Sequence, residues 1–228
     1  MVLITQSSRL YDVVIDKILT EGYSVCAILL VGSQVVPQLV DASSDVDLLV
    51  IVDNQAPDFY KHSDVNMRME VSGVRIQWSC MSLQFLLNLP SIDPPKLPYT
   101  GSFCCLTYET ITSLFANEQF CTEIECLTRN WRHTRKQCAA NYIRAQKQVI
   151  LTILSHGLSE RNTTKAIHHI IRCGAILNDT EHLIDYQELL RIKRICRKAL
   201  TAADEQAMYS HLYDTLQALY TYDKLTNS

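Results

Sequence analysis

Short apolar runs separated by polar turns occupy the first part of the chain. Residues 8–21 carry apolar side chains at helical spacing, which predicts an amphipathic helix that ends at Gly22. Residues 24–31 form a continuous apolar run of strand length, which predicts a strand covered on both faces. Acidic and apolar residues alternate at the start of residues 45–52, so we predict a second strand there.

A hairpin and a proline cluster follow these two predicted strands. Residues 66–71 and 74–80 have strand-like composition and flank Ser72-Gly73, a two-residue loop typical of a β-hairpin. Four strands of this kind predict a mixed sheet. The prolines between residues 90 and 98 exclude a regular helix and indicate a boundary.

The pattern beyond the prolines is almost entirely helical. Apolar faces recur there at helical spacing and include Tyr142 and Ile150, Ile167 and Ile170, Leu189 and Leu190, and Met208 and Leu212. We therefore predict an α/β (α+β) protein, with a mixed-sheet domain over residues 1–100 and an all-helical domain over residues 101–228. The active cleft is expected between the two domains.

Composition limits the classes of partner, the cellular location and the metals that the chain can be expected to have. A net charge of −3 and a pI near 6.1 argue against a uniformly positive surface that binds nucleic acid non-specifically. The N-terminus does not resemble a secretory signal, and no apolar run is long enough to span a bilayer, so we expect a soluble, cytoplasmic protein with no membrane partner. The nine cysteines include no matched Cys-x-x-Cys pairs, which argues against a zinc site.

The turn between the first two predicted strands carries the residues that suggest chemistry. Gly32-Ser33 follows the first strand, and eleven residues later come Asp45 and, after one valine, Asp47. A Gly-Ser turn offers backbone N–H groups and a hydroxyl to phosphate oxygens, and a helix after Ser33 would add a favourable potential. Two aspartates one residue apart on a strand share a face and can hold Mg²⁺, or Mn²⁺ in its place, beside a nucleoside triphosphate.

These four residues resemble the signature of the DNA polymerase β superfamily of nucleotidyltransferases, in which Gly-Ser, a short spacer and Asp-x-Asp lie between apolar residues. The resemblance implies a third carboxylate on a neighbouring strand, which helps to hold the catalytic metal and to deprotonate the acceptor hydroxyl. The expected strand, residues 74–80, contains no acid, and Gln77 stands on the expected face. Glu70 would lie opposite Arg75 and on the face of Gln77, either as a substitute third carboxylate or as an ordinary ion-pair partner of Arg75.

A basic stripe lies in the predicted helical domain. Lys165, His168, His169 and Arg172 occupy relative positions 0, 3, 4 and 7 of a predicted helix, which aligns them along one side. Such a stripe could bind a triphosphate or a nucleic-acid backbone, and the alternative is a solvated basic face.

The order of features in both predicted domains is similar to that of the predicted nucleotidyltransferases associated with bacterial RNA repair. The segments that carry this similarity are Phe85 with residues 86–90, Tyr142 with Gln146, and the basic stripe. The resemblance implies Mg²⁺-dependent transfer of a nucleoside monophosphate from an NTP such as ATP to a hydroxyl, with RNA as the favoured acceptor. The alternative acceptors to RNA are a small aminoglycoside-type compound and a protein side chain. A catalytically degenerate protein that binds nucleotide or a partner in a regulatory role is the alternative from another class, and Gln77 favours it.

Overall fold

The structure is a computed structural model that describes residues 3–21, 24–36, 38, 40, 45–54, 67–91, 111–156, 167–195 and 201–227. The sheet-forming part of the chain contains α1 (Leu3–Thr20), β1 (Val25–Val31), the 3₁₀ helix η1 (Gly32–Val35), β2 (Val46–Val52), β3 (Met67–Val71), β4 (Val74–Ser82), α3 (Leu83–Asn88), the 3₁₀ helix η3 (Leu89–Ser91), β5 (Thr112–Ala116) and α5 (Glu118–Thr128). Thereafter come α6 (Trp131–His156), α7 (Ile167–Leu177), the 3₁₀ helix η6 (Glu181–Leu183), α8 (Tyr186–Ile195) and α9 (Ala202–Thr226).

The five strands form one mixed sheet in the order β3-β4-β2-β1-β5. β1 pairs antiparallel with β2 and with β5, β2 pairs parallel with β4, and β3 pairs antiparallel with β4. The predicted mixed sheet is confirmed. β2 is its central strand, with β1 and β4 on either side, and this position explains why its apolar run is almost wholly buried.

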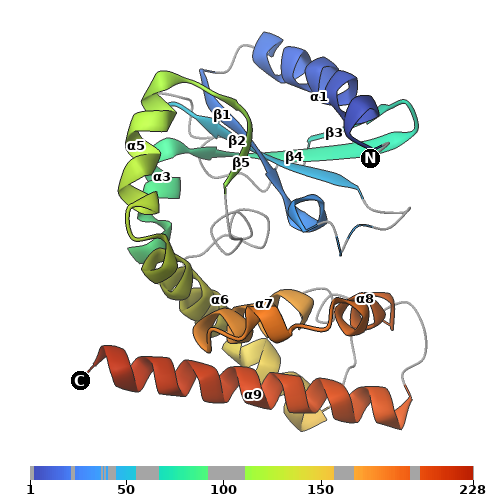
Figure 1. The fold of residues 1–228 in the computed structure, drawn as a ribbon, viewed down its shortest axis with the longest axis vertical. Coiled ribbons are helices and arrows are strands. Elements are labelled where there is room, and N and C mark those ends of the chain that lie inside the picture. The colour runs from blue at the N-terminus through green and yellow to red at the C-terminus, as the bar shows by residue number, and fades with distance from the viewer. Residues whose placement is uncertain are drawn as a thin grey trace. The chain divides into compact units, whose positions relative to one another are not determined.

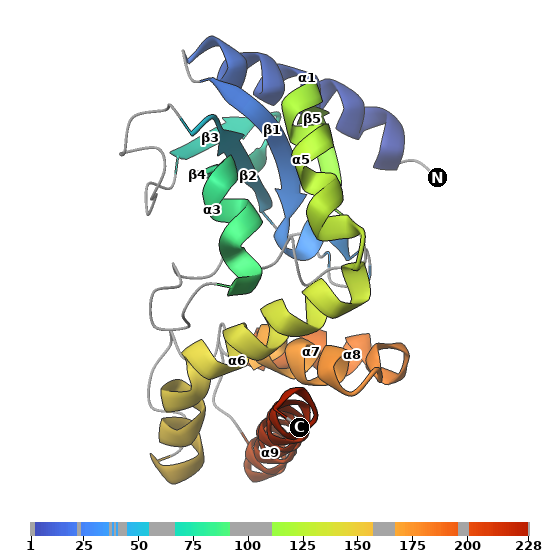
Figure 2. The same cartoon turned by 90° about the vertical axis from the view of Figure 1, so that its left-hand side faces the viewer.

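Helices cover both faces of this sheet (Figures 1 and 2). α1 lies on one face, where Val14 and Ile18 are fully buried against Ile28, Leu48 and Trp78 and their neighbours. α3 and α5 lie on the opposite face and contact β2 and β1, respectively. α1 begins at Leu3, earlier than predicted, while Gly22, its predicted end, lies outside the described residues.

The β3–β4 hairpin has the predicted turn and register. Ser72 and Gly73 both have positive φ, at 52° and 79°, which is typical of a two-residue turn of type I′. Val71 pairs with Val74, and Glu70 pairs with Arg75. The two-residue loop therefore sets which side chains of β3 and β4 share a face.

Residues beyond the proline cluster return to the sheet. The chain divides into one compact unit of residues 1–89 and 98–131 and a second of residues 90–97 and 132–228. Sequence analysis assigned residues 101–228 to the helical domain, whereas β5 pairs with β1 and belongs to the first unit together with α5. β5 is short and only partly buried, so its apolar residues do not form the continuous run that identifies an interior strand.

The regular elements described in the second unit are all helices, and α7 packs most closely on α9. A Cβ atom at Gly174 of α7 would lie 2.6 Å from Thr215 Oγ1 and 3.1 Å from Thr215 Cα on α9. Glycine therefore allows the two helix backbones to approach. In the part of the chain that the structure describes, no helix has both the length and the apolar character needed to cross a bilayer.

Gly174→Ala is expected to destabilise this unit. Overpacking of a tight contact costs about 1–3 kcal/mol, which outweighs the roughly 1 kcal/mol that alanine gains over glycine inside a helix. Removing Thr215 Oγ1 in the double variant Gly174→Ala/Thr215→Ala should recover part of the loss. Denaturant unfolding of the full chain measures the loss of stability and its partial recovery. If Gly174→Ala alone is as stable as the parent chain, the packing argument is contradicted.

Candidate active site

The turn after β1 brings the backbone against a carboxylate of β2. Gly32 has a φ of 71°, a backbone conformation that residues other than glycine rarely adopt. A Cβ atom at this position would lie 2.5 Å from Asp47 Oδ2, closer than any non-bonded contact allows. The Gln34 amide donates to the backbone oxygen of Asp45 at 3.4 Å and ties the turn to the start of β2. Gly32 is therefore required both by its φ and by the space that Asp47 takes.

Asp45 and Asp47 share one face of the sheet, as predicted. Val46 and Leu48, which alternate with them, point into the core beneath α1. Both carboxylates are half-buried, and β2 proper begins at Val46, directly after Asp45. The alternation at the start of β2 thus places two acidic side chains together on the face opposite α1, beside the Gly32 turn.

Gln77 stands next to Asp47 on the adjoining strand. The parallel register of β2 and β4 pairs Asp47 directly with Gln77, and the Gln77 amide donates a hydrogen bond to Asp47 Oδ1. This is the place where the superfamily resemblance implies a third carboxylate. A neutral amide therefore lies there, and it presents a donor to the neighbouring aspartate.

Arg75 pairs with Asp45, a contact that sequence analysis did not foresee. Its guanidinium lies 2.8 Å from Asp45 Oδ1, with 68% of the Arg75 side chain and 31% of the Asp45 side chain exposed. Oδ1 itself is enclosed and receives no hydrogen bond of good geometry from the described residues, so the contact is an ionic one. Pairs this exposed contribute about 0–1 kcal/mol, because water screens the charges and both side chains lose freedom.

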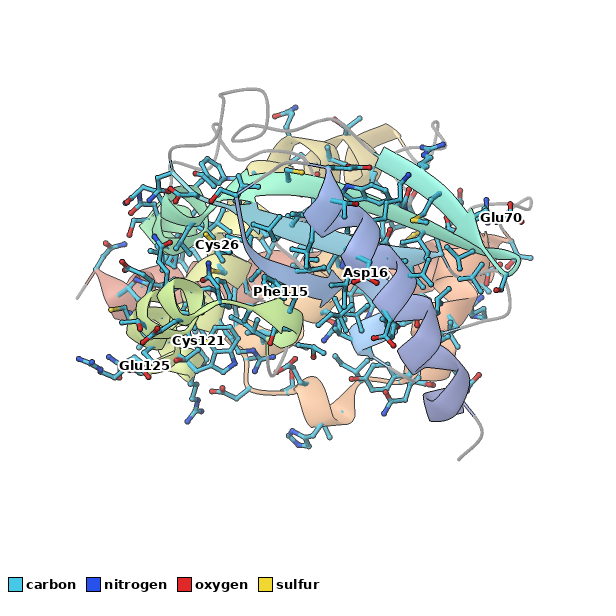
Figure 3. The ribbon with its side chains drawn as sticks, turned by 90° about the horizontal axis from the view of Figure 1, so that it is seen from above. Asp16, Cys26, Glu70, Phe115, Cys121 and Glu125 are labelled. Atoms are coloured by element: carbon cyan, nitrogen blue, oxygen red, sulfur yellow. The ribbon has the colours of Figure 1, made fainter. Side chains whose placement is uncertain are left out.

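Glu70 lies across β4 from Asp45. It pairs with Arg75 in the hairpin register and is exposed, close to the turn end of the β3–β4 hairpin (Figure 3). Glu70 therefore shares a face with Gln77, as predicted. Arg75 makes its ion pair with Asp45, and the role of Glu70 as a third carboxylate stays a prediction.

The segment that directly follows β1 is a short 3₁₀ helix. Within the described residues 32–36 it is the four-residue η1, which begins at Gly32 and ends at Val35, too short to give the potential of a long helix N-terminus. The backbone of Ser33 lies in η1, while its side chain is outside the described part of the structure. The predicted contacts of Gly32 and Ser33 with phosphate stay predictions.

Three of the four residues of the predicted basic stripe lie in α7 of the second unit. Lys165 lies outside the described residues, and the rings of His168 and His169 are adjacent, with centroids 3.8 Å apart. The Arg172 side chain is only 7% exposed and lies 3.9 Å from Glu181 Oε1, a carboxylate that also accepts from Arg135 at 2.8 Å. Arg172 is thus buried beside an acid rather than displayed on a solvated face. Binding of nucleotide by this stripe stays a prediction.

The thiols at two interior positions are not suited to nucleophilic chemistry. Burial raises the pKa of Cys80 to about 11, with a smaller contribution from the negative charge of Glu21. Burial raises the pKa of Cys138 to about 12. Since the thiolate is the reactive form, both side chains behave as small apolar groups.

The donor set around Gly32 fits a divalent cation that is held partly by its substrate. Two carboxylates share a face beside a turn that leaves no room for a side chain, and hard cations take carboxylate oxygens together with substrate phosphates. Across the described ranges, no group of three or more His, Cys, Asp and Glu side chains is placed to hold a metal by itself. Asp45 and Asp47 are therefore the side chains that would hold Mg²⁺.

Comparisons with known proteins do not assign the chain to a family. No protein-family model matches the chain, and no curated protein sequence matches it. Among solved structures, the chain is similar to a nucleotidyltransferase-like protein from Exiguobacterium sibiricum 255-15, with a TM-score of 0.31 and 17% identity over 87% of this chain and 69% of that chain. A TM-score this low does not establish a common fold.

Proposed function

We propose that the first unit is a metal-dependent nucleotidyltransferase module. The observation that carries the proposal is the contact between the Gly32 turn and the carboxylate of Asp47, with Asp45 on the same face. The Gly32 turn thus lies beside two carboxylates, and phosphoryl-type transfer needs little more than positioning and charge stabilisation.

The proposed reaction transfers a nucleoside monophosphate from an NTP to a hydroxyl. The acceptor oxygen forms a bond to the α-phosphorus, the bond from this phosphorus to the bridging oxygen breaks, and pyrophosphate leaves. Gly32 and Ser33 hold phosphate oxygens, and Asp45 and Asp47 hold the cation. Bound Mg²⁺ would neutralise the charge that develops on the phosphates. Glu70 is proposed to take the proton of the acceptor hydroxyl.

RNA is the proposed acceptor, with the α7 residues as a nucleotide-binding surface. The support is the resemblance to nucleotidyltransferases associated with bacterial RNA repair, which extends to the residues of the basic stripe. Lys165, His168 and His169 are proposed to bind nucleotide phosphates, and Arg172, which is buried beside Glu181, would have to leave that carboxylate to join them. A small aminoglycoside-type compound or a protein hydroxyl are the other acceptors of the same chemistry.

Labelling separates these acceptors. The full chain is incubated with each of the four NTPs labelled at the α-phosphate, Mg²⁺, and separate pools of tRNA, aminoglycosides and protein. We expect label in the RNA pool, and its loss when Asp45→Asn and Asp47→Asn are combined. Label confined to the aminoglycoside or protein pool would reject RNA as acceptor and keep the transfer reaction.

A second candidate function is nucleotide binding without transfer. The contacts of Gln77 with Asp47 and of Arg75 with Asp45 favour it, since both carboxylates then have partners other than a metal. In this case NTP with Mg²⁺ should raise the melting temperature while no pool acquires label. Saturation at a hundredfold excess over Kd stabilises the folded state by about 2.7 kcal/mol, which is large enough to measure. Neither a shift nor a labelled product would refute both functions.

A further inference from the structure

Two groups of β4 already engage the carboxylates of β2, one for each carboxylate. The Arg75 guanidinium lies 2.8 Å from Asp45 Oδ1, and the Gln77 amide donates to Asp47 Oδ1. Their order follows from the parallel register, which pairs Asp47 with Gln77 and sets Arg75 level with Asp45. β4 therefore presents a nitrogen donor to each aspartate. In a two-metal site, the same positions would hold a cation and an oxygen ligand for it.

The chemistry of the Gln77 side chain determines how it can act. An ionised carboxylate accepts hydrogen bonds and donates none, so the amide must present its NH₂ group to Asp47 and turn its oxygen away. Mg²⁺ and Mn²⁺ take oxygen ligands. In this orientation Gln77 supplies no ligand to a cation at Asp47, whereas an aspartate or glutamate would.

Arg75 brings a permanent positive charge to the other carboxylate. Its guanidinium supplies one unit of the positive charge that a second metal would supply. The Arg75 side chain is largely open to solvent, at 68% exposed, whereas the Asp45 side chain is 31% exposed and its Oδ1 is enclosed. A cation bound with its nucleotide can therefore compete with Arg75 for Asp45. A second cation would meet the charge of Arg75 and would lack a third carboxylate to bind it.

The remaining carboxylate of this region, Glu70, is separated from Asp45 by a strand. Glu70 is exposed and pairs with Arg75 in the hairpin register, so that β4 lies between Glu70 and β2. Within the described parts of the chain, the potential metal ligands do not form a group of three. The described ligand set around the Gly32 turn thus contains two acids.

We infer that Asp45 and Asp47 take one divalent cation together with the nucleotide, and that Arg75 and Gln77 occupy the positions of a second. The inference rests on the proposed function and specifies it. The site holds a triphosphate through a single cation, and activation of the acceptor hydroxyl is left to side chains. Restoring an acid at residue 77 should create the second cation position.

Counting bound Mn²⁺ tests this inference without measuring activity. Equilibrium dialysis of the full chain against Mn²⁺ and α,β-methylene-ATP, which cannot undergo transfer at the α-phosphorus, gives the number of cations per bound nucleotide. We expect one for the parent chain and two for Gln77→Asp. Gln77→Glu, which is nearly isosteric, is the second variant in case the shorter side chain does not fold, and circular dichroism checks both.

Thr112→Asp is the matched control. It adds the same charge at an exposed position of β5, at the opposite edge of the sheet from β3, and should leave the count at one. Two cations per nucleotide in the parent chain would overturn the inference and leave the proposed function standing. An unchanged count of one in both folded Gln77 variants would also overturn it. If the parent chain binds neither nucleotide nor Mn²⁺, the proposed function itself fails.

Discussion

Asp47→Asn is expected to remove Mg²⁺-dependent nucleotide binding and to lower transfer by about 10²–10³-fold or more, the size of effect seen when one preorganised electrostatic contact to a reacting centre is lost. Asparagine has nearly the same shape but lacks the negative charge that holds the cation. Its side-chain oxygen would still accept from Gln77, so the free energy of unfolding should change by no more than about 1 kcal/mol. Thermal shift with NTP and Mg²⁺, followed by α-phosphate labelling, measures the two losses.

Glu70→Gln in the same assays separates binding from proton transfer. Glu70 is exposed and lies away from the Gly32 turn, so nucleotide binding should persist. If Glu70 accepts the acceptor proton, transfer should fall by about 10²–10⁴-fold, the usual contribution of a general base. Unchanged transfer would remove Glu70 from this role and leave the function of Asp47 untouched.

Gly32→Ala is the second large effect that we expect. A methyl group at this position would lie 2.5 Å from Asp47 Oδ2, so either the carboxylate or the turn must move. The left-handed backbone conformation adds a cost of about 1–2 kcal/mol for any residue with a Cβ atom. Nucleotide binding should therefore be lost, and the unfolding midpoint in denaturant should fall.

Gly73→Ala provides the matched comparison. Gly73 has a similar φ of 79°, but a Cβ atom there would meet no other atom within 4 Å. This variant should show the backbone cost alone and keep the binding of NTP with Mg²⁺. Loss of binding in both variants would mean that destabilisation of the unit, and not the contact with Asp47, explains the effect at Gly32.

The features that sequence reasoning predicted are those that depend on neighbouring residues. The strand β1 follows from a continuous apolar run, the shared face of Asp45 and Asp47 on β2 from alternation, and the hairpin register from a two-residue loop. The contact of Arg75 with Asp45 depends on the pairing of β2 with β4, which are separated in the chain by β3. Local pattern does not specify such a pairing, so the sequence predicts Glu70 alone as a partner of Arg75.

Two further features were missed for similar reasons. β5 reaches the sheet from beyond the proline cluster, and its partly exposed side chains resemble those of a surface segment. Arg172 was considered part of an outward stripe, because helical periodicity aligns residues but does not say what covers them. Its partner Glu181 comes from η6, a one-turn element that follows α7. Burial of Arg172 therefore depends on how this short segment folds back.

The central position of β2 determines how the carboxylates respond when the sheet unit fluctuates. Strands at the margin of a sheet, here β3 and β5, separate from their single neighbour more readily than a strand that is hydrogen-bonded on both sides. Partial opening at either margin leaves β1, β2 and β4 together. Asp47 is thus carried by a strand whose backbone amides should be among the slowest of this unit to exchange with solvent, while Asp45 directly precedes that strand.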